Sequence, residues 1–202
     1  MTEYDSPDPI ERMFQGNEVF RKTDFLPNIT YWRQIVLGQK PKILWIGCSD
    51  SRVNPERITG SIPGELFVQR NIGNIVPLQD WNFTTVLEYA LMNLRVDHII
   101  ICGHSDCGAI KALDKEESDD YYISIWLNNA KDAKTRVDAV IKTPNTPQEI
   151  RERHHLIELE NIRLQMEHLK AHPLVKKTVK ERTIHFHGLY FDLISGKLTR
   201  VD

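Results

Sequence analysis

Two short segments of the chain combine cysteine, histidine and charged residues at close spacing. The first contains Cys48, Asp50 and Arg52 in the run Gly-Cys-Ser-Asp-Ser-Arg, and the second contains His104 and Cys107 in the run Gly-His-Ser-Asp-Cys-Gly. Thiolate and imidazole are ligands that zinc prefers, and a His-x-x-Cys turn lets both side chains reach one ion at about 2.0 to 2.3 Å. If the two segments lie side by side, three such ligands meet.

The carboxylate and the guanidinium of the first segment indicate more than metal holding. Asp50 could coordinate the ion or accept a hydrogen bond from a metal-bound water, and Arg52 could hold that carboxylate in a bidentate pair. Three ligands with a positioned carboxylate favour a catalytic zinc site, which keeps one coordination position open. Each cysteine could instead be a small buried hydrophobic residue, and Cys102, inside an apolar run, is interpreted that way.

Continuous apolar runs lead into both segments. Residues 43–47 and 98–103 are apolar without alternation, which is typical of parallel strands buried on both faces, and residues 66–68 and 184–191 are further strand candidates. Residues 84–94 and 148–170 carry apolar side chains at helical spacing. The pattern predicts an α/β fold with a central, mostly parallel β-sheet flanked by helices, and ligands gather at the carboxyl ends of such strands.

A helical arm is predicted before the first strand. Asp8 and Pro9 are typical of a helix start, and residues 28–37 form a second candidate helix. The arm contains Phe14, Phe20, Phe25, Tyr31 and Trp32. We expect one domain over residues 1–202, with the arm over 1–38 and the α/β core over 39–202.

Composition excludes several classes of protein. The 202 residues include 26 Lys and Arg against 28 Asp and Glu, so the net charge of -2 gives no electrostatic argument for a nucleic-acid or membrane partner. Three cysteines cannot form a complete disulfide framework. No apolar run approaches the roughly 20 residues of a membrane span, and residues 1–9 lack the features of a signal peptide. We expect a soluble, cytoplasmic protein.

The spacing Cys48-x-Asp50-x-Arg52 followed by His104-x-x-Cys107 resembles the signature of the β-class carbonic anhydrases, and the likeness extends from about residue 7 to about residue 192. Supporting runs are Pro63-Gly64-Glu65, Arg70-Asn71-Ile72-Gly73-Asn74 and Glu88-Tyr89-Ala90. The resemblance implies a zinc cofactor held by Cys48, His104 and Cys107, with Asp50 and Arg52 as catalytic residues. It implies reversible hydration of carbon dioxide to bicarbonate and a proton by zinc-bound hydroxide.

By the same resemblance, Gln39, Phe67, Ile72 and Tyr89 lie where plant-type members hold carbon dioxide, and Gly108 lies where a backbone N–H can bond the substrate. From the residues alone, Phe67, Ile72 and Tyr89 would be interpreted as core. Gln39 would be interpreted as a surface amide.

Some bacterial members of the family bind bicarbonate at a second site built from Trp, Arg and Tyr. Trp45 and Arg70 match the first two positions, whereas the third falls on Phe191, next to Tyr190. A core role for Trp45 is therefore preferred.

The resemblance also implies partners and leaves alternatives. Family members form dimers, some paired into tetramers, in which the arm embraces the neighbouring subunit, so a homodimer or a dimer-based tetramer is expected. Asp50 is implied in two states, paired with Arg52 or bound to zinc as an inhibitory fourth ligand. A carbonyl sulfide or carbon disulfide hydrolase of the same fold is the first alternative. A non-enzymatic, redox-sensitive zinc-thiolate protein is the second.

Overall fold

The computed structural model describes residues 7–115 and 121–201. The chain forms two compact units, Met1–Lys40 and Pro41–Asp202. The first six residues of the predicted arm lie outside the described residues. The expected organisation as one domain with a boundary after residue 38 stays a prediction.

The first unit is helical, as predicted. Helix α1 (Pro9–Phe20) continues into a π-helical turn, η1 (Arg21–Phe25), and is followed by α2 (Ile29–Ile35). The Asp8 carboxylate accepts a hydrogen bond from the Ile10 N–H at 2.8 Å. This N-cap satisfies a backbone donor that the first turn leaves free, which explains why the helix begins at Pro9.

Most of the aromatic residues of the arm contact one another. The ring centroid of Trp32 lies 5.4 Å from those of Phe20 and Phe25 and 5.9 Å from that of Tyr31. In contrast, α1 exposes large apolar side chains, namely Ile10, Met13 and Phe14. The aromatic group thus stabilises the arm itself, while α1 carries an apolar surface.

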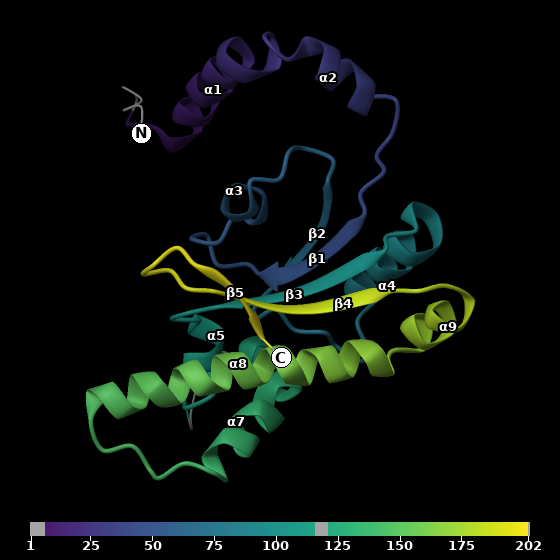
Figure 1. The fold of residues 1–202 in the computed structure, drawn as a ribbon. Helices are drawn as coiled ribbons and strands as arrows, with labels where there is room; N and C mark the ends of the chain where they lie inside the picture. The colour runs from purple at the N-terminus through teal and green to yellow at the C-terminus, as the bar shows by residue number, and fades with distance from the viewer. Residues whose placement is uncertain (1–6, 116–120, 202) are drawn as a thin grey trace. The chain divides into compact units, whose positions relative to one another are not determined.

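The second unit is built on a five-stranded sheet (Figure 1). Its order is β2-β1-β3-β4-β5, and β4 and β5 alone are antiparallel to each other. The strands are β1 (Ile43–Cys48), β2 (Leu66–Asn71), β3 (His98–His104), β4 (His185–Phe191) and β5 (Leu198–Val201). The predicted mostly parallel sheet is confirmed. Strand β5 was not predicted. It has only four residues, and the two in the middle are polar, so its sequence gives little indication of a strand.

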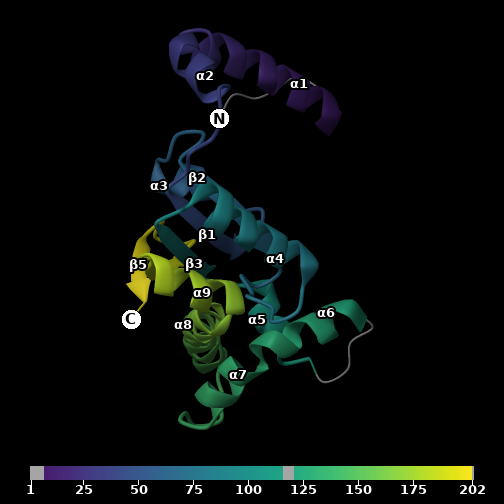
Figure 2. The ribbon, with the colours of Figure 1, turned by 90° about the vertical axis from the view of Figure 1, so that its right-hand side faces the viewer.

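Helices cover the two faces of the sheet unequally. One face packs Leu44, Ile46 and Ile99 against helical residues such as Leu87 and Ile162. Figure 1 shows α8 and α9 along this face and α3 on the other, and Figure 2 views α8 nearly end-on. The helices of the unit are α3 (Pro55–Thr59), α4 (Trp81–Glu88) with η2 (Tyr89–Leu94), α5 (Gly108–Ala112), α6 (Tyr121–Leu127) with η3 (Asn128–Ala130), α7 (Lys131–Asp138), α8 (Pro147–Ala171) and α9 (Pro173–Glu181).

Capping explains where the two predicted helices of this unit begin. The Thr146 side chain accepts from the Glu149 N–H, and the Glu149 carboxylate accepts from the Thr146 N–H, so a capping box starts α8 one residue before the predicted range. The Asp80 carboxylate accepts from the Phe83 N–H at 2.6 Å, so α4 starts three residues before the predicted residue 84.

The register of the sheet brings the two chemistry-bearing segments together. Strands β1 and β3 are parallel neighbours, with Gly47 paired to Cys102. Cys48 is the last residue of β1 and His104 is the last residue of β3. The carboxyl ends of parallel neighbours meet at one edge, so these side chains leave the sheet side by side.

None of the helices in the described ranges is long and apolar enough to cross a membrane.

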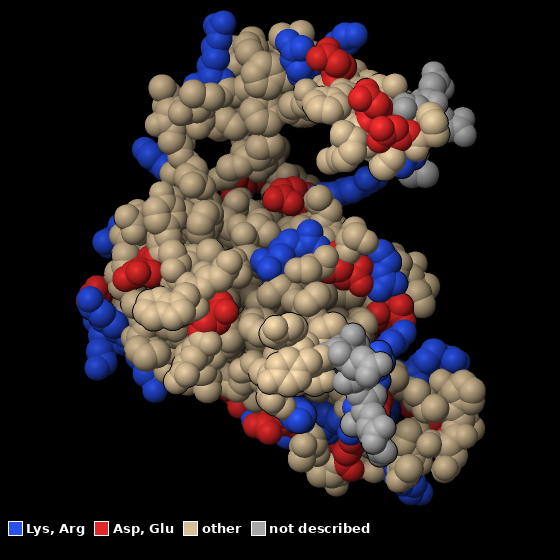
Figure 3. Space-filling view, turned by 180° about the vertical axis from the view of Figure 1, so that it is seen from behind, with Lys and Arg blue, Asp and Glu red and all other residues tan. Residues whose placement is uncertain are grey.

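On the face of the second unit seen in Figure 3, basic and acidic side chains are scattered among uncharged ones.

Candidate metal centre

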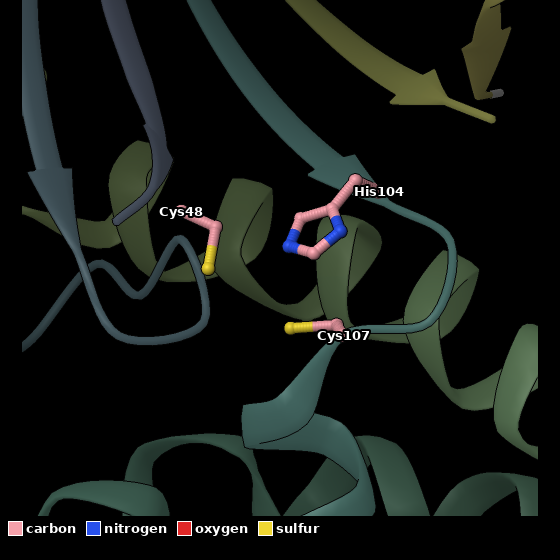
Figure 4. Close-up of side chains that lie close together, drawn as sticks. All are labelled: Cys48, His104 and Cys107. Carbon is pink, nitrogen blue, oxygen red and sulfur yellow. The ribbon is translucent and has the colours of Figure 1, made fainter. Parts of the chain in front are cut away.

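The side chains of Cys48, His104 and Cys107 converge beyond the sheet edge (Figure 4). Their ligand atoms all lie within 4.8 Å of one another, and all three residues are buried. Cys107 is the N-cap of α5 and directly follows the two-residue turn after β3. The predicted convergence of these three side chains is confirmed.

The imidazole of His104 is oriented for metal binding. Its Nδ1 lies 2.8 Å from the Ser105 carbonyl oxygen. Because a carbonyl oxygen can only accept a hydrogen bond, Nδ1 must be the donor and therefore carries the ring proton. Its buried Nε2 has no hydrogen-bond partner among the described residues. A buried lone pair without a partner is costly unless a ligand satisfies it. The nitrogen and two sulfurs form the donor set of a zinc site, so the residues present fit this metal.

The three cysteines differ in acidity for structural reasons. A hydrogen bond from the Cys107 thiol lowers the pKa of Cys48, whereas the Cys48 thiolate beside it raises the pKa of Cys107. Two sulfurs that share one proton are suited to a cation that replaces it. Burial raises the pKa of Cys102 to about 12. Cys102 packs with Trp45 and Ile100, in a different cluster from Cys48 and Cys107, which confirms its interpretation as a buried hydrophobic residue.

Asp50 and Arg52 form the predicted pair. The Arg52 Nε donates to Asp50 Oδ1 at 2.9 Å, the Nη2 donates to Oδ2 at 2.7 Å, and the Arg52 backbone N–H also reaches Oδ1 at 2.9 Å. These bonds hold the pKa of the Asp50 carboxyl well below its usual range. Asp50 Oδ2 lies 3.9 Å from His104 Nε2. An ionised carboxylate is thus held beside the cluster of Cys48, His104 and Cys107.

Arg70 fixes the backbone that carries Cys48 and Asp50. Its Nε donates to the Cys48 carbonyl oxygen at 2.8 Å and its Nη2 donates to the Asp50 carbonyl oxygen at 2.6 Å. Because one rigid guanidinium bonds both carbonyls, the ligand and the carboxylate keep a constant spacing.

Residues 190 and 191 point to opposite faces of the sheet. Phe191 packs in the same cluster as Trp45, which is fully buried, as expected for a core role. The Tyr190 hydroxyl instead donates to Glu158 Oε2 at 2.7 Å on the α8 side. Phe191, on which the third position of the resemblance falls, is therefore the residue that packs with Trp45.

The described structure does not bring all of the predicted substrate-pocket residues into contact with one another. The rings of Phe67 and Tyr89 are in contact, with centroids 5.7 Å apart. Ile72 lines an apolar hollow of about 560 Å³ together with Ser49, the neighbour of Cys48. Gly108 is the first residue of α5, and the space where its side chain would lie is open. Gln39 belongs to the first unit. The joint role of these residues as one pocket stays a prediction.

A polar stripe on the buried side of α8 supports the cluster and was missed from the sequence. Glu158 Oε1 accepts from the Cys107 N–H at 3.0 Å, Asn161 donates to the Gly73 carbonyl oxygen at 3.0 Å, and Gln165 accepts from the Val76 N–H at 2.8 Å. Burial raises the pKa of Glu158. Glu158, Asn161 and Gln165 stand at positions i, i+3 and i+7 of a helix, so the sequence places them on one face, and polar residues on an otherwise apolar face could have indicated this supporting role.

Comparison with known proteins identifies similar chains. A model of the family described as carbonic anhydrase matches residues 43–198. The chain is 34% identical over 200 residues to a carbonic anhydrase of Pseudomonas aeruginosa, covering 91% of this chain and 83% of the relative. It is 30% identical over 198 residues to a carbonic anhydrase of Synechococcus elongatus, covering 95% of this chain and 71% of the relative.

Solved structures show the same likeness. The structure of the β-carbonic anhydrase CcaA has a TM-score of 0.87 at 31% identity and covers 96% of both chains. A structure from a study of two tetrameric β-carbonic anhydrases of Sordaria macrospora has a TM-score of 0.85 at 32% identity, covering 95% of this chain and 96% of the other.

Proposed function

Because this chain belongs to the β-class carbonic anhydrase family, we propose that Cys48, His104 and Cys107 are its zinc ligands and that Asp50 and Arg52 are its catalytic residues. Its activity is that of a carbonic anhydrase (carbonate dehydratase), the reversible hydration of carbon dioxide to bicarbonate and a proton. The observation that carries the residue assignment is the unpartnered, buried Nε2 of His104 facing two cysteine sulfurs.

Zinc held by Cys48, His104 and Cys107 would supply the acidification of a water molecule for attack on carbon dioxide, and the charge of the two thiolates would limit that acidification. Asp50 remains ionised and accepts a hydrogen bond from the attacking oxygen, which orients a lone pair toward the substrate. Arg52 bonds both carboxylate oxygens of Asp50, which would keep Asp50 from coordinating the metal. We assign Phe67, Ile72 and Tyr89, with Gln39, to holding carbon dioxide, and the Gly108 N–H to binding its oxygen. The open space at Gly108 supports this assignment.

We expect the hydration rate to rise through alkaline pH. Arg52 lowers the pKa of Asp50 in the folded protein. The Asp50 carboxylate therefore stabilises the fold at every pH above its unfolded pKa of about 4. This stabilisation is lost only when the pH falls through the lower pKa of the folded protein. Asp50 therefore does not titrate near neutrality, and the rise belongs to the weakly acidified water of a two-thiolate site. The measurement is kcat between about pH 6 and pH 9.5, and a rate already constant below pH 7 contradicts the proposal.

We propose a homodimer or dimer-based tetramer in which the arm contacts a second subunit. The tetrameric state of the Sordaria macrospora β-carbonic anhydrases and the exposed apolar residues of α1 support this. Light scattering of the full chain should give a dimer or tetramer mass, and a stable monomer refutes the assembly.

A cytoplasmic location is proposed because a reducing compartment keeps the zinc ligands as thiols.

The substrate is proposed to be carbon dioxide rather than carbonyl sulfide or carbon disulfide. The similarity to carbonic anhydrases along nearly the whole chain supports this choice. Stopped-flow assays with each substrate on one zinc-loaded preparation decide the question, because faster turnover of carbonyl sulfide or carbon disulfide would reverse it.

A further inference from the structure

Arg52 has a second carboxylate partner in addition to Asp50. Its Nη1 donates to Asp106 Oδ2 at 3.0 Å and its Nη2 donates to the Asp106 carbonyl oxygen at 3.2 Å. We propose that Asp106, held in turn by Lys111, is a positioning residue that orients Arg52 so that Arg52 can hold Asp50. The inference rests on the proposed roles of Asp50 and Arg52.

The two carboxylates use different edges of one planar guanidinium. Asp50 takes the edge formed by Nε and Nη2, and Asp106 takes the adjacent edge formed by Nη1 and Nη2, so that the two N–H groups of Nη2 serve one partner each. Because the donors of arginine are fixed in one plane, bonds at both edges fix its rotation as well as its position. Asp106 therefore supports the Asp50 contact without competing for it.

Asp106 is itself held in place. The Lys111 ammonium from α5 pairs with Asp106 Oδ1, the oxygen that Arg52 does not use. The backbone of Asp106 has a φ of 61°, in the left-handed region that aspartate, asparagine and glycine tolerate best. It lies between the ligands His104 and Cys107, so the loop that presents two ligands also presents the carboxylate that orients Arg52.

Without the Asp106 side chain, Arg52 Nη1 would lose its carboxylate partner, and only the Nη2 bond to the backbone carbonyl of residue 106 would hold that end of the guanidinium. The Arg52 side chain is 47% exposed, and Arg52, Asp106 and Lys111 line the same hollow of about 690 Å³. A long, half-exposed side chain held at one edge alone keeps more conformers than one held at two. Losing Asp106 should thus loosen the Asp50 pair while leaving the ligands in place.

The test compares two variants of the zinc-loaded full chain. Asp106→Gly removes the side chain and accepts the positive φ without strain, whereas Asp106→Asn keeps an oxygen acceptor for Arg52. Asp97→Asn is the matched control, because Asp97 is a similarly exposed partner of Lys42 and Arg182 at the other end of the sheet. The readouts are zinc content, kcat and KM, and solvent exchange of the Arg52 Nε–H by NMR, assigned by its loss in Arg52→Lys.

We expect Asp106→Gly to retain zinc, to exchange the Arg52 Nε–H about 10-fold faster and to lower kcat about 10-fold with KM little changed. Asp106→Asn should recover part of both effects, and Asp97→Asn should match the wild type. Unchanged exchange in both Asp106 variants overturns the inference, whether or not zinc or activity is lost. Because exchange does not depend on turnover, faster exchange without a loss of kcat would instead contradict the proposed catalytic roles of Asp50 and Arg52.

Discussion

Replacing Cys48 by serine is expected to abolish stoichiometric zinc binding and to reduce carbon dioxide hydration by about 1,000-fold or more. The serine hydroxyl is not ionised at neutral pH, so it offers zinc no anionic sulfur in place of the thiolate, and two remaining ligands bind the metal weakly. Cys48 is 6% exposed and packs beside Ile75 and Cys107. Since serine is of similar size, the fold should survive and the loss should be confined to the metal.

The measurement is zinc per chain after dialysis, together with the hydration rate and thermal unfolding. Cys102→Ser is the matched control, because Cys102 is also buried but donates its S–H to the Gly103 carbonyl oxygen, a bond that a hydroxyl can replace. This control should keep zinc and activity. Full zinc content in Cys48→Ser would remove Cys48 from the ligand set.

Replacing Arg52 by alanine is expected to lower turnover about 100-fold while zinc stays bound, an effect comparable to losing a preorganised hydrogen-bond donor elsewhere. The substitution removes the two side-chain bonds to Asp50 and the main reason for its lowered pKa. With Oδ2 only 3.9 Å from His104 Nε2, the freed carboxylate can reach the metal position. The expected result is an intact but inhibited metal centre.

Measured kcat and zinc content in one preparation check this result. Arg57→Ala, an exposed arginine in α3, is the matched control and should behave as the wild type. Arg52→Lys should lie between alanine and the wild type, because an ammonium restores the charge without the bidentate geometry. Near-normal turnover in Arg52→Ala would reject the paired role of Asp50 and Arg52.

The central part of the fold and of the site was predictable because both depend on local patterns. Residues 43–47 and 98–103 are apolar throughout, so their assignment to buried parallel strands did not require knowledge of their neighbours. Placing Cys48 and His104 at the ends of those strands was then enough to predict their convergence. The Asp50 and Arg52 pair follows equally from its short spacing.

Other features depend on contacts between distant parts of the chain. Glu158 reaches the Cys107 N–H across 51 positions and Arg52 reaches Asp106 across 54, and neither spacing carries a signal in one sequence. Strand β5 pairs with β4 alone, at the edge of the sheet, and its four residues carry little strand signal of their own.

The most direct test of the account is the carbon dioxide hydration rate of the wild-type protein as a function of its zinc content. Zinc is removed with a chelator and returned in steps, and each sample is assayed by stopped flow. The account predicts a rate proportional to bound zinc that saturates at one ion per chain. Fully zinc-loaded protein without hydration activity would contradict it and would favour a non-enzymatic, redox-sensitive zinc-thiolate protein.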